Sequence, residues 1–199
     1  MNYHNITHDD MLNGDGLRVV LWVAGCNHHC PDCQNPVTWD PEDGIPFDMA
    51  AELEIWAALY EPHCAGLTLS GGDPLYPANR PRITQLCRDM KTEFPDKTIW
   101  MYTGYLWHEV RHLAVVHYVD VLIDGPYIEA LRSPTRPWVG SENQHVIDVQ
   151  KSLDEGRVIL WRDRDGEKRE TPKGETGEGA GDDSFEPCGT YPNKKGCCG

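Results

Sequence analysis

No apolar run in this sequence is long enough to cross a lipid bilayer, because a membrane-spanning helix needs about 20 consecutive apolar residues. The first five residues also lack the basic and apolar regions of a secretory signal peptide. These two absences exclude a membrane-embedded protein and argue against export. We therefore expect a cytoplasmic protein in a reducing environment, without a membrane partner.

Positive charge is also scarce in the chain. Its 199 residues include 18 lysines and arginines against 32 aspartates and glutamates, which gives a formal net charge of −14. A protein that binds nucleic acid through the phosphates needs many basic side chains. The composition therefore argues against a nucleic-acid partner.

The eight cysteines do not suit a small secreted disulfide scaffold, because the chain is long and shows no export signal. Three of them, Cys26, Cys30 and Cys33, fall within eight residues, so their thiolates can converge on one metal site. Cys87 lies on the apolar face of a helical pattern and is expected in the core. Cys64 is expected in a loop.

Apolar, β-branched segments alternate with helical patterns along the chain. Strands are expected at residues 18–23, 66–70, 98–102 and 119–123, with two later strands at 145–149 and 157–161. Helical patterns lie between them at about residues 48–60, 83–90 and 106–113. This alternation predicts an α/β fold with a parallel sheet and right-handed crossovers. Since three or four such units are too few for a closed eight-fold barrel, we expect an open, partial (β/α) barrel.

The first helical pattern begins after Asp48, whose side chain is a suitable N-cap. The apolar residues on one face of this pattern are expected to be buried. They are Met49, Leu53, Trp56, Ala57 and Tyr60.

Loops at the carboxyl ends of the strands build the functional site in such a fold. Four segments with chemically useful residues or glycine turns follow predicted strands. They are the cysteine segment at residues 26–33, Gly71-Gly72-Asp73, Thr103-Gly104 and Asp124-Gly125. We expect these four segments to converge.

The spacing Cys26-x3-Cys30-x2-Cys33 is the most informative motif in the chain. Three thiolates at this spacing suit three corners of a cubane cluster and leave one iron without a protein ligand. An open coordination position separates catalytic metal sites from structural ones. The alternative is a zinc knuckle with His28 or His29 as the fourth ligand, which would make the chain a non-catalytic zinc-binding interaction module.

The cysteine motif, together with residues 70–75 (Ser-Gly-Gly-Asp-Pro-Leu), resembles the radical S-adenosylmethionine (SAM) superfamily. Further stretches are similar to one branch of it, the anaerobic ribonucleoside-triphosphate reductase activating proteins. These stretches are residues 13–18, 100–105, 122–127 and 140–144. The likeness runs from residue 2 to about residue 161.

The resemblance implies a radical SAM partial barrel and an oxidoreductase with one [4Fe-4S] cluster on Cys26, Cys30 and Cys33. The open iron would chelate SAM, and one electron would split SAM into methionine and a 5′-deoxyadenosyl radical. This radical would take a hydrogen atom from a glycine of the large anaerobic ribonucleoside-triphosphate reductase subunit. A low-potential electron donor such as a flavodoxin is also implied, and no catalytic residue beyond the cluster and SAM. Pyruvate formate-lyase activating enzyme and 7-carboxy-7-deazaguanine synthase remain alternatives.

The resemblance also implies which residues contact SAM. Gly71 and Gly72 would let the backbone approach the methionine part, and Asp73 would accept hydrogen bonds from the amino group. The backbone of Asp32, Cys33 and Gln34 would lie beside SAM and the cluster. Candidates for the adenosine or substrate side are Tyr102, Thr103, Asp124 and Asn143. Many relatives carry an aromatic residue near the third cysteine, where this chain has Asp32 and Gln34.

Residues 166–199 differ in character from the radical SAM domain expected at residues 1–165. They are polar and glycine-rich without apolar periodicity, so we expect a flexible, disordered tail. Cys188, Cys197 and Cys198 lie in this tail and have no role in the resemblance.

A chain that ends at Asp165 is therefore expected to assemble its cluster and to bind SAM like the full chain. Iron and sulfide analysis and thermal unfolding of both chains test this. A joint loss of cluster content and thermal stability in the shorter chain would show that the tail cysteines support the fold or the cluster.

Overall fold

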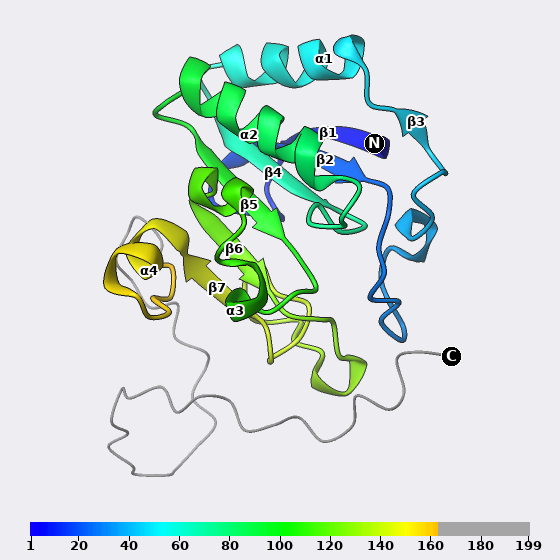
Figure 1. Ribbon diagram of the computed structural model, residues 1–199, viewed down its shortest axis with the longest axis vertical. Helices are drawn as coiled ribbons and strands as arrows, with labels where there is room; N and C mark the ends of the chain where they lie inside the picture. Colours follow the sequence, from blue (N-terminus) through cyan, green and yellow to red (C-terminus); the bar gives the residue numbers. More distant parts are fainter. Residues whose placement is uncertain (163–199) are drawn as a thin grey trace.

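The computed structural model describes residues 1–162. Its centre is a seven-stranded sheet in the order β3-β1-β2-β4-β5-β6-β7 (Figure 1). The strands are β1 (Asn2–Asp10), β2 (Leu17–Val23), β3 (Ile45–Pro46), β4 (Cys64–Gly71), β5 (Thr98–Tyr102), β6 (Val121–Asp124) and β7 (His145–Asp148). The tail expected at residues 166–199, with Cys188, Cys197 and Cys198, lies outside the described residues.

The four inner strands β2, β4, β5 and β6 are parallel to one another, as the alternation of strands and helices predicted. The outer strands β1, β3 and β7 pair antiparallel to their neighbours. Because β3 and β7 are the two ends of the strand order, the sheet is open. Neither β1 nor β3 was predicted. Most of β1 is only half-buried, so the strand carries little apolar alternation.

The strand predicted at residues 157–161 is wrong. Within this segment an isolated bridge joins Leu160 to Ile147 on β7. The backbone N–H of Ile159 donates instead to the side-chain oxygen of Ser152, at 2.8 Å. This side-chain contact replaces part of the ladder that a strand would need.

Helices α1 and α2 cover one face of the sheet (Figure 1). The α-helices are α1 (Met49–Tyr60), α2 (Arg80–Glu93), α3 (Trp107–Val110) and α4 (Val149–Glu155). Short 3-10 turns lie at η1 (Pro36–Thr38), η2 (Ala114–Tyr118) and η3 (Glu129–Leu131). None of the helices within residues 1–162 has both the length and the apolar character needed to span a bilayer.

The buried face of α1 differs from the predicted one. Asp48 caps the helix as expected and accepts hydrogen bonds from the backbone of Ala50 and Ala51. However, Met49, Leu53 and Tyr60 are exposed. The core side is formed by Ala51, Ile55 and Leu59. Both sets have helical spacing, so the apolar pattern alone did not distinguish the two faces.

Two further cysteines occupy the core. Cys87 on α2 is fully buried, as predicted. The loop position predicted for Cys64 is wrong, because β4 begins at Cys64, two residues before the predicted strand, and buries it.

The face of the sheet away from α1 and α2 contains a buried cation, Arg18 on β2. Its Nε donates to Thr68 Oγ1 at 2.7 Å. Its two Nη atoms donate, at 2.8–3.0 Å, to Thr98 Oγ1 and to the carbonyl oxygens of Asp15, Leu67 and Thr98. Burial lowers the pKa of Arg18 to about 10, so the guanidinium stays charged at neutral pH. Arg18 thus joins β2, β4 and β5 near their amino ends.

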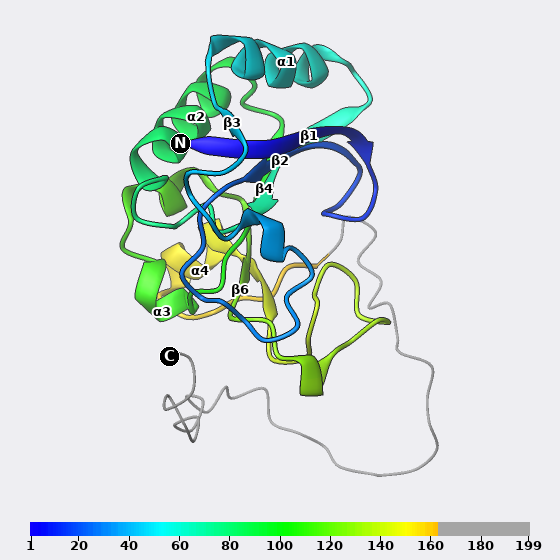
Figure 2. The same cartoon turned by 90° about the vertical axis from the view of Figure 1, so that its right-hand side faces the viewer.

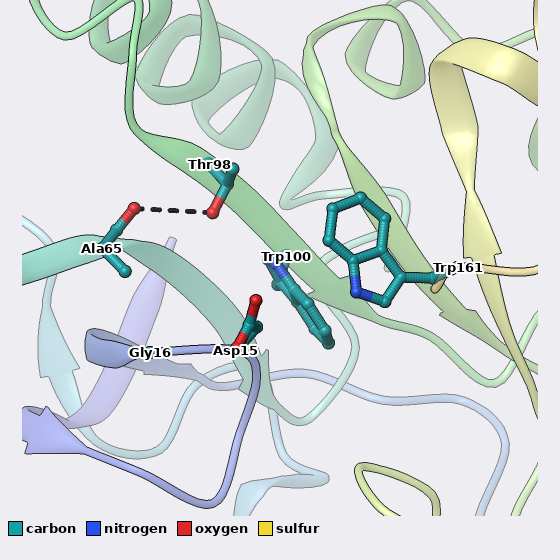
Figure 3. Close-up of a pocket in the computed structure, with 6 residues that line it drawn as sticks. All are labelled: Asp15, Gly16, Ala65, Thr98, Trp100 and Trp161. Atoms are coloured by element: carbon teal, nitrogen blue, oxygen red, sulfur yellow. Dashed lines mark hydrogen bonds between the residues drawn. The ribbon is translucent and has the colours of Figure 1, made fainter. Parts of the chain in front are cut away.

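A small cavity lies at the same amino-terminal end of the strands (Figure 3). Its lining residues are Asp15, Gly16, Ala65, Thr98, Trp100 and Trp161. The volume of about 100 Å³ is well below the roughly 300–1,000 Å³ of typical ligand pockets. This cavity is therefore too small to hold SAM.

Replacing Arg18 with Met is expected to lower the free energy of unfolding by about 2–4 kcal/mol, because the buried carbonyl groups of Leu67 and Thr98 lose their donor. Arg18→Lys keeps the charge but loses the planar guanidinium group with its several N–H donors. Its stability should therefore lie between that of the parent chain and that of Arg18→Met. Urea denaturation of the apoprotein measures both. Equal stability of Arg18→Met and the parent would show that these hydrogen bonds contribute nothing net.

Candidate metal centre

The loop after β2 carries the three clustered cysteines at the carboxyl end of the parallel strands. This loop and the segment after β6 extend from the same end of the molecule (Figures 1 and 2). Cys26, Cys30 and Cys33 are each partly exposed, and no disulfide joins them to one another. Three of the segments expected to converge, the cysteine loop, Gly71-Gly72-Asp73 and Thr103-Gly104, meet at the side chain of Asp73. The fourth lies next to them, since Gly125 N donates to Tyr105 O at 2.9 Å.

Backbone hydrogen bonds hold the start of the cysteine loop against the end of β4. Gly72 N donates to Val23 O and Asp73 N donates to Gly25 O, both at 2.8 Å. A Cβ atom on Gly72 would lie 2.6 Å from Gly25 O, and one on Gly71 would lie 2.7 Å from Val23 N. The two glycines thus allow the strand end to approach the cysteine loop. Their approach to SAM stays a prediction.

The carboxylate of Asp73 is buried at the centre of this edge, with 1% of the residue exposed. Leu75 N donates to Oδ1 at 2.8 Å, and the Thr103 hydroxyl lies 3.0 Å from both oxygens. Gly104 N donates to Oδ2 at 3.0 Å, and His28 Nε2 lies 2.8 Å from the same oxygen. Asp73 therefore joins the ends of β4 and β5 to the cysteine loop.

His28 is the side chain of the loop that reaches this carboxylate. Its ring also packs edge-on against Tyr105, with the centroids 4.5 Å apart. A Cβ atom on Gly104 would lie 2.4 Å from His28 Cδ2, so the imidazole fits only because residue 104 is glycine. The zinc alternative needs His28 or His29 as a ligand. Nε2 of His28 faces Asp73 instead, and the ring of His29 packs against a tryptophan.

The donor set, three thiols in one loop, fits three corners of a multi-iron cluster. In the described part of the chain, no three His, Cys, Asp or Glu side chains stand close enough to hold a single metal ion. Sulfurs around one zinc lie roughly 3.8 Å apart, whereas a cubane binds each sulfur on a different iron. Burial raises the pKa of Cys26 to about 11, although backbone hydrogen bonds from His28 and His29 oppose the shift. Metal binding must therefore displace the thiol proton.

Asp124 at the end of β6 holds neighbouring loops in place. Its Oδ2 accepts from Trp107 N at 2.9 Å, and its Oδ1 lies 3.0 Å from His145 Nδ1. Asn143 donates to a backbone carbonyl in the turn after β6, at 2.8 Å. Tyr102 packs with the aromatic cluster on the face opposite α1 and α2. Each of these side chains has a contact within the fold, although the buried Oδ1 of Asn143 accepts no hydrogen bond, and their contact with a ligand stays a prediction.

An open depression of about 520 Å³ lies between the cysteine loop and the segment after β6, a size typical of ligand pockets. Its lining residues are Asp32, Gln34, Tyr127, Glu129 and Arg132. Asp32 and Gln34 were expected beside the cluster. Tyr127 lines the depression together with Gln34, so an aromatic ring lies on the side of the depression opposite the cysteine loop, and its hydroxyl donates to Glu129.

Sequence reasoning missed two features of this site. It considered His28 only as a zinc ligand, although the contact with Asp73 joins residues 45 positions apart. It also did not identify Glu129 and Arg132 as lining residues. A single sequence contains no signal for such distant pairs. The nearest clue was Gly104, whose missing side chain leaves the room that His28 occupies.

Comparison with known proteins identifies the family. The sequence profile of the 4Fe-4S single cluster domain matches residues 12–147. Three similar proteins are each named anaerobic ribonucleoside-triphosphate reductase-activating protein. The one from Enterobacteria phage T4 is 46% identical over 147 residues, which cover 73% of this chain and 93% of the relative. The one from Escherichia coli K12 is 42% identical over 150 residues, which cover 73% of this chain and 97% of the relative.

The third relative, from Vibrio cholerae serotype O1, is 43% identical over 148 residues, which cover 72% of this chain and 96% of the relative. The match therefore spans almost the whole length of each relative. The family model, over residues 12–147, includes the cysteine loop and the ends of all four parallel strands. The chain belongs to the 4Fe-4S single cluster domain family and to the anaerobic ribonucleoside-triphosphate reductase-activating proteins.

Proposed function

We propose that this chain activates an anaerobic ribonucleoside-triphosphate reductase through reductive cleavage of SAM. The observation that carries the proposal is the loop of Cys26, Cys30 and Cys33 at the carboxyl end of four parallel strands, in a chain of the reductase-activating family. The chain is thus an iron–sulfur oxidoreductase whose product is an activated partner protein.

The difficult chemistry belongs to the bound groups. When bound, the [4Fe-4S] cluster and SAM supply a 5′-deoxyadenosyl radical that removes a hydrogen atom from a glycine of the reductase. The protein contributes placement and shielding. Cys26, Cys30 and Cys33 would each hold one iron as a thiolate, which leaves the fourth iron for SAM. We assign no catalytic acid or base to the chain.

We place SAM in the depression beside the cysteine loop. Its volume of about 520 Å³ is large enough for a ligand such as SAM. The cavity at the amino ends of the strands is too small for such a ligand. Two of the proposed contacts, Asp32 and Gln34, line this depression. The other proposed contacts lie in the cysteine loop and at the neighbouring strand ends, and they are Cys33, Gly71, Gly72, Asp73, Thr103 and Asp124.

The architecture supports the finer parts of this proposal. Four parallel strands with helices on one face and the candidate site at their carboxyl ends favour the open, partial (β/α) barrel of radical SAM enzymes. The proposed partners are the large reductase subunit and a low-potential electron donor such as a flavodoxin. A cytoplasmic location stays a prediction from the sequence.

The alternatives have less support. The similar proteins bear the name of the reductase-activating protein, and not that of a pyruvate formate-lyase activating enzyme or a 7-carboxy-7-deazaguanine synthase. For a zinc-binding module, residues 1–162 contain no group of three side chains that could hold a single zinc ion.

Replacing Cys30 with Ala is expected to abolish SAM cleavage, because a cubane with two protein ligands loses its fixed position and its single open iron. After anaerobic reconstitution, the parent chain should contain one four-iron cluster and Cys30→Ala should not. Iron, sulfide and 5′-deoxyadenosine are the quantities to measure. Cys87→Ala is the matched control, since this thiol lies on the buried face of α2. Full SAM cleavage by Cys30→Ala would contradict the ligand assignment.

Asp73 allows a test of SAM binding. Four donors already meet its carboxylate, about as many as its lone pairs accept, so the SAM amino group must displace one of them. Asp73→Asn keeps the shape but removes the charge. SAM affinity should fall about tenfold to hundredfold, since a charge-assisted hydrogen bond contributes about 1.5–3 kcal/mol.

Titration of the reduced cluster with SAM, followed by electron paramagnetic resonance and scaled to iron content, measures this affinity. Parent-like affinity in Asp73→Asn would mean that backbone groups alone hold the methionine end of SAM.

A further inference from the structure

We propose that His28 is a positioning residue, which fixes the cysteine loop on Asp73 and so determines how firmly the loop retains its cluster. The inference rests on the proposed function, because it takes Cys26, Cys30 and Cys33 as the cluster ligands. It assigns to His28 no contact with the cluster or with SAM.

The first argument concerns how the loop is held. Backbone hydrogen bonds lie near its two ends, where Cys26 N donates to Trp39 O at 3.0 Å and Cys33 N donates to Cys30 O at 3.1 Å. Between these points His29 and Asp32 have left-handed backbone angles, with φ of +45° and +57°. Such angles are uncommon for residues other than glycine, although histidine and aspartate adopt them more readily than most residues do. Side-chain contacts therefore help to hold the middle of the loop.

His28 makes the most buried of these contacts. The distance from its Nε2 to Asp73 Oδ2 is 2.8 Å, and the Asp73 side chain is 1% exposed against 17% for His28. The neighbouring contact, in which Tyr105 Oη donates to Asn27 Oδ1, is longer at 3.3 Å and exposed. A buried hydrogen bond to a carboxylate is stronger than an exposed neutral one.

Asp73 is a fixed acceptor. Leu75 N, Gly104 N and the Thr103 hydroxyl orient its carboxylate without any contribution from the cysteine loop. His28 therefore docks on a group whose position is set by the ends of β4 and β5. Since His28 lies two residues from both Cys26 and Cys30, its place limits where both sulfurs can lie.

Gly104 provides independent support. A Cβ atom at this position would lie 2.4 Å from Cδ2 and 2.8 Å from Nε2 of His28. The backbone of Gly104 has no left-handed angle that would itself require glycine. Residue 104 must therefore be glycine because a larger side chain would occupy the space of the His28 imidazole.

The test compares His28→Ala with two matched variants of the full chain. His28→Gln keeps a side-chain N–H that can reach the carboxylate. His29→Ala removes the neighbouring imidazole, which packs against Trp39 and not against Asp73. Each protein is reconstituted anaerobically, and the loss of iron to an excess of ferrous chelator is followed with time.

Cluster loss should be about tenfold to hundredfold faster in His28→Ala, the usual effect of removing a partner that orients metal ligands. His28→Gln should restore most of the parent rate, and His29→Ala should stay within about threefold of it. Gly104→Ala should reproduce the fast loss with His28 present, because its methyl group displaces the ring. The melting temperature of each apoprotein separates these rates from general unfolding.

A parent-like rate in both His28→Ala and Gly104→Ala would overturn the inference. The same would follow if His28→Gln and His28→Ala lost iron equally fast, since the hydrogen bond would then have no part in the effect. Cys30→Ala distinguishes the two levels of the argument. If it keeps a full cluster, the proposed function itself fails; if it loses the cluster while His28→Ala does not, only the positioning role fails.

Discussion

The buried carboxylate of Asp73 is the interaction on which the candidate site depends. An isolated buried carboxylate is costly, and hydrogen-bond donors must offset the loss of water. Here the donors come from the end of β4, the end of β5 and the cysteine loop. Because the same group satisfies all three, none of these segments can move far without leaving a buried charge with fewer partners. The Gly71-Gly72 turn adds backbone contacts to the start of the loop. The Gly-Gly-Asp motif therefore has a visible structural role at the base of the cysteine loop, in addition to the contact with SAM that we propose.

The two ends of the parallel strands are built differently. Near the amino ends, Arg18 meets five acceptors and the adjoining cavity is small. Near the carboxyl ends, a wide depression opens between the cysteine loop and Tyr127. A saturated buried network gives rigidity, whereas a binding site needs room and groups that can exchange partners. This division agrees with the general rule that open α/β sheets bind ligands at the carboxyl ends of their strands.

Much of this arrangement could be predicted from the sequence because it depends on local patterns. The spacing of Cys26, Cys30 and Cys33 after an apolar segment located the metal loop, and β5 was predicted with its observed bounds. Three predictions failed where local pattern was ambiguous or was overridden by tertiary contacts. In α1 both faces are apolar enough to pack, and only the sheet beneath selects Ile55 and Leu59. The segment near Leu160 keeps two backbone hydrogen bonds to β7, but Ile159 N donates to a serine side chain and no regular strand forms. Cys64 was placed in a loop because its neighbours Pro62 and His63 conceal that β4 starts there. The contact between His28 and Asp73 could not be predicted for a different reason. It depends on which strand ends become neighbours in the folded sheet, and a single sequence does not show this.

The cysteine loop also differs along its own length. Its first part is held by contacts within the chain, because His28, two residues after Cys26, contacts Asp73, whose other donors come from the ends of β4 and β5. Its last part faces the open depression through Asp32 and Gln34 and contains a left-handed residue, Asp32. The free energy of metal binding contributes to ordering such a segment. A loop that is held near Cys26 loses less conformational freedom when the cluster binds than a wholly flexible loop does. The contact between His28 and Asp73 thus holds the first part of the loop, and the open depression leaves room for a ligand beside its last part.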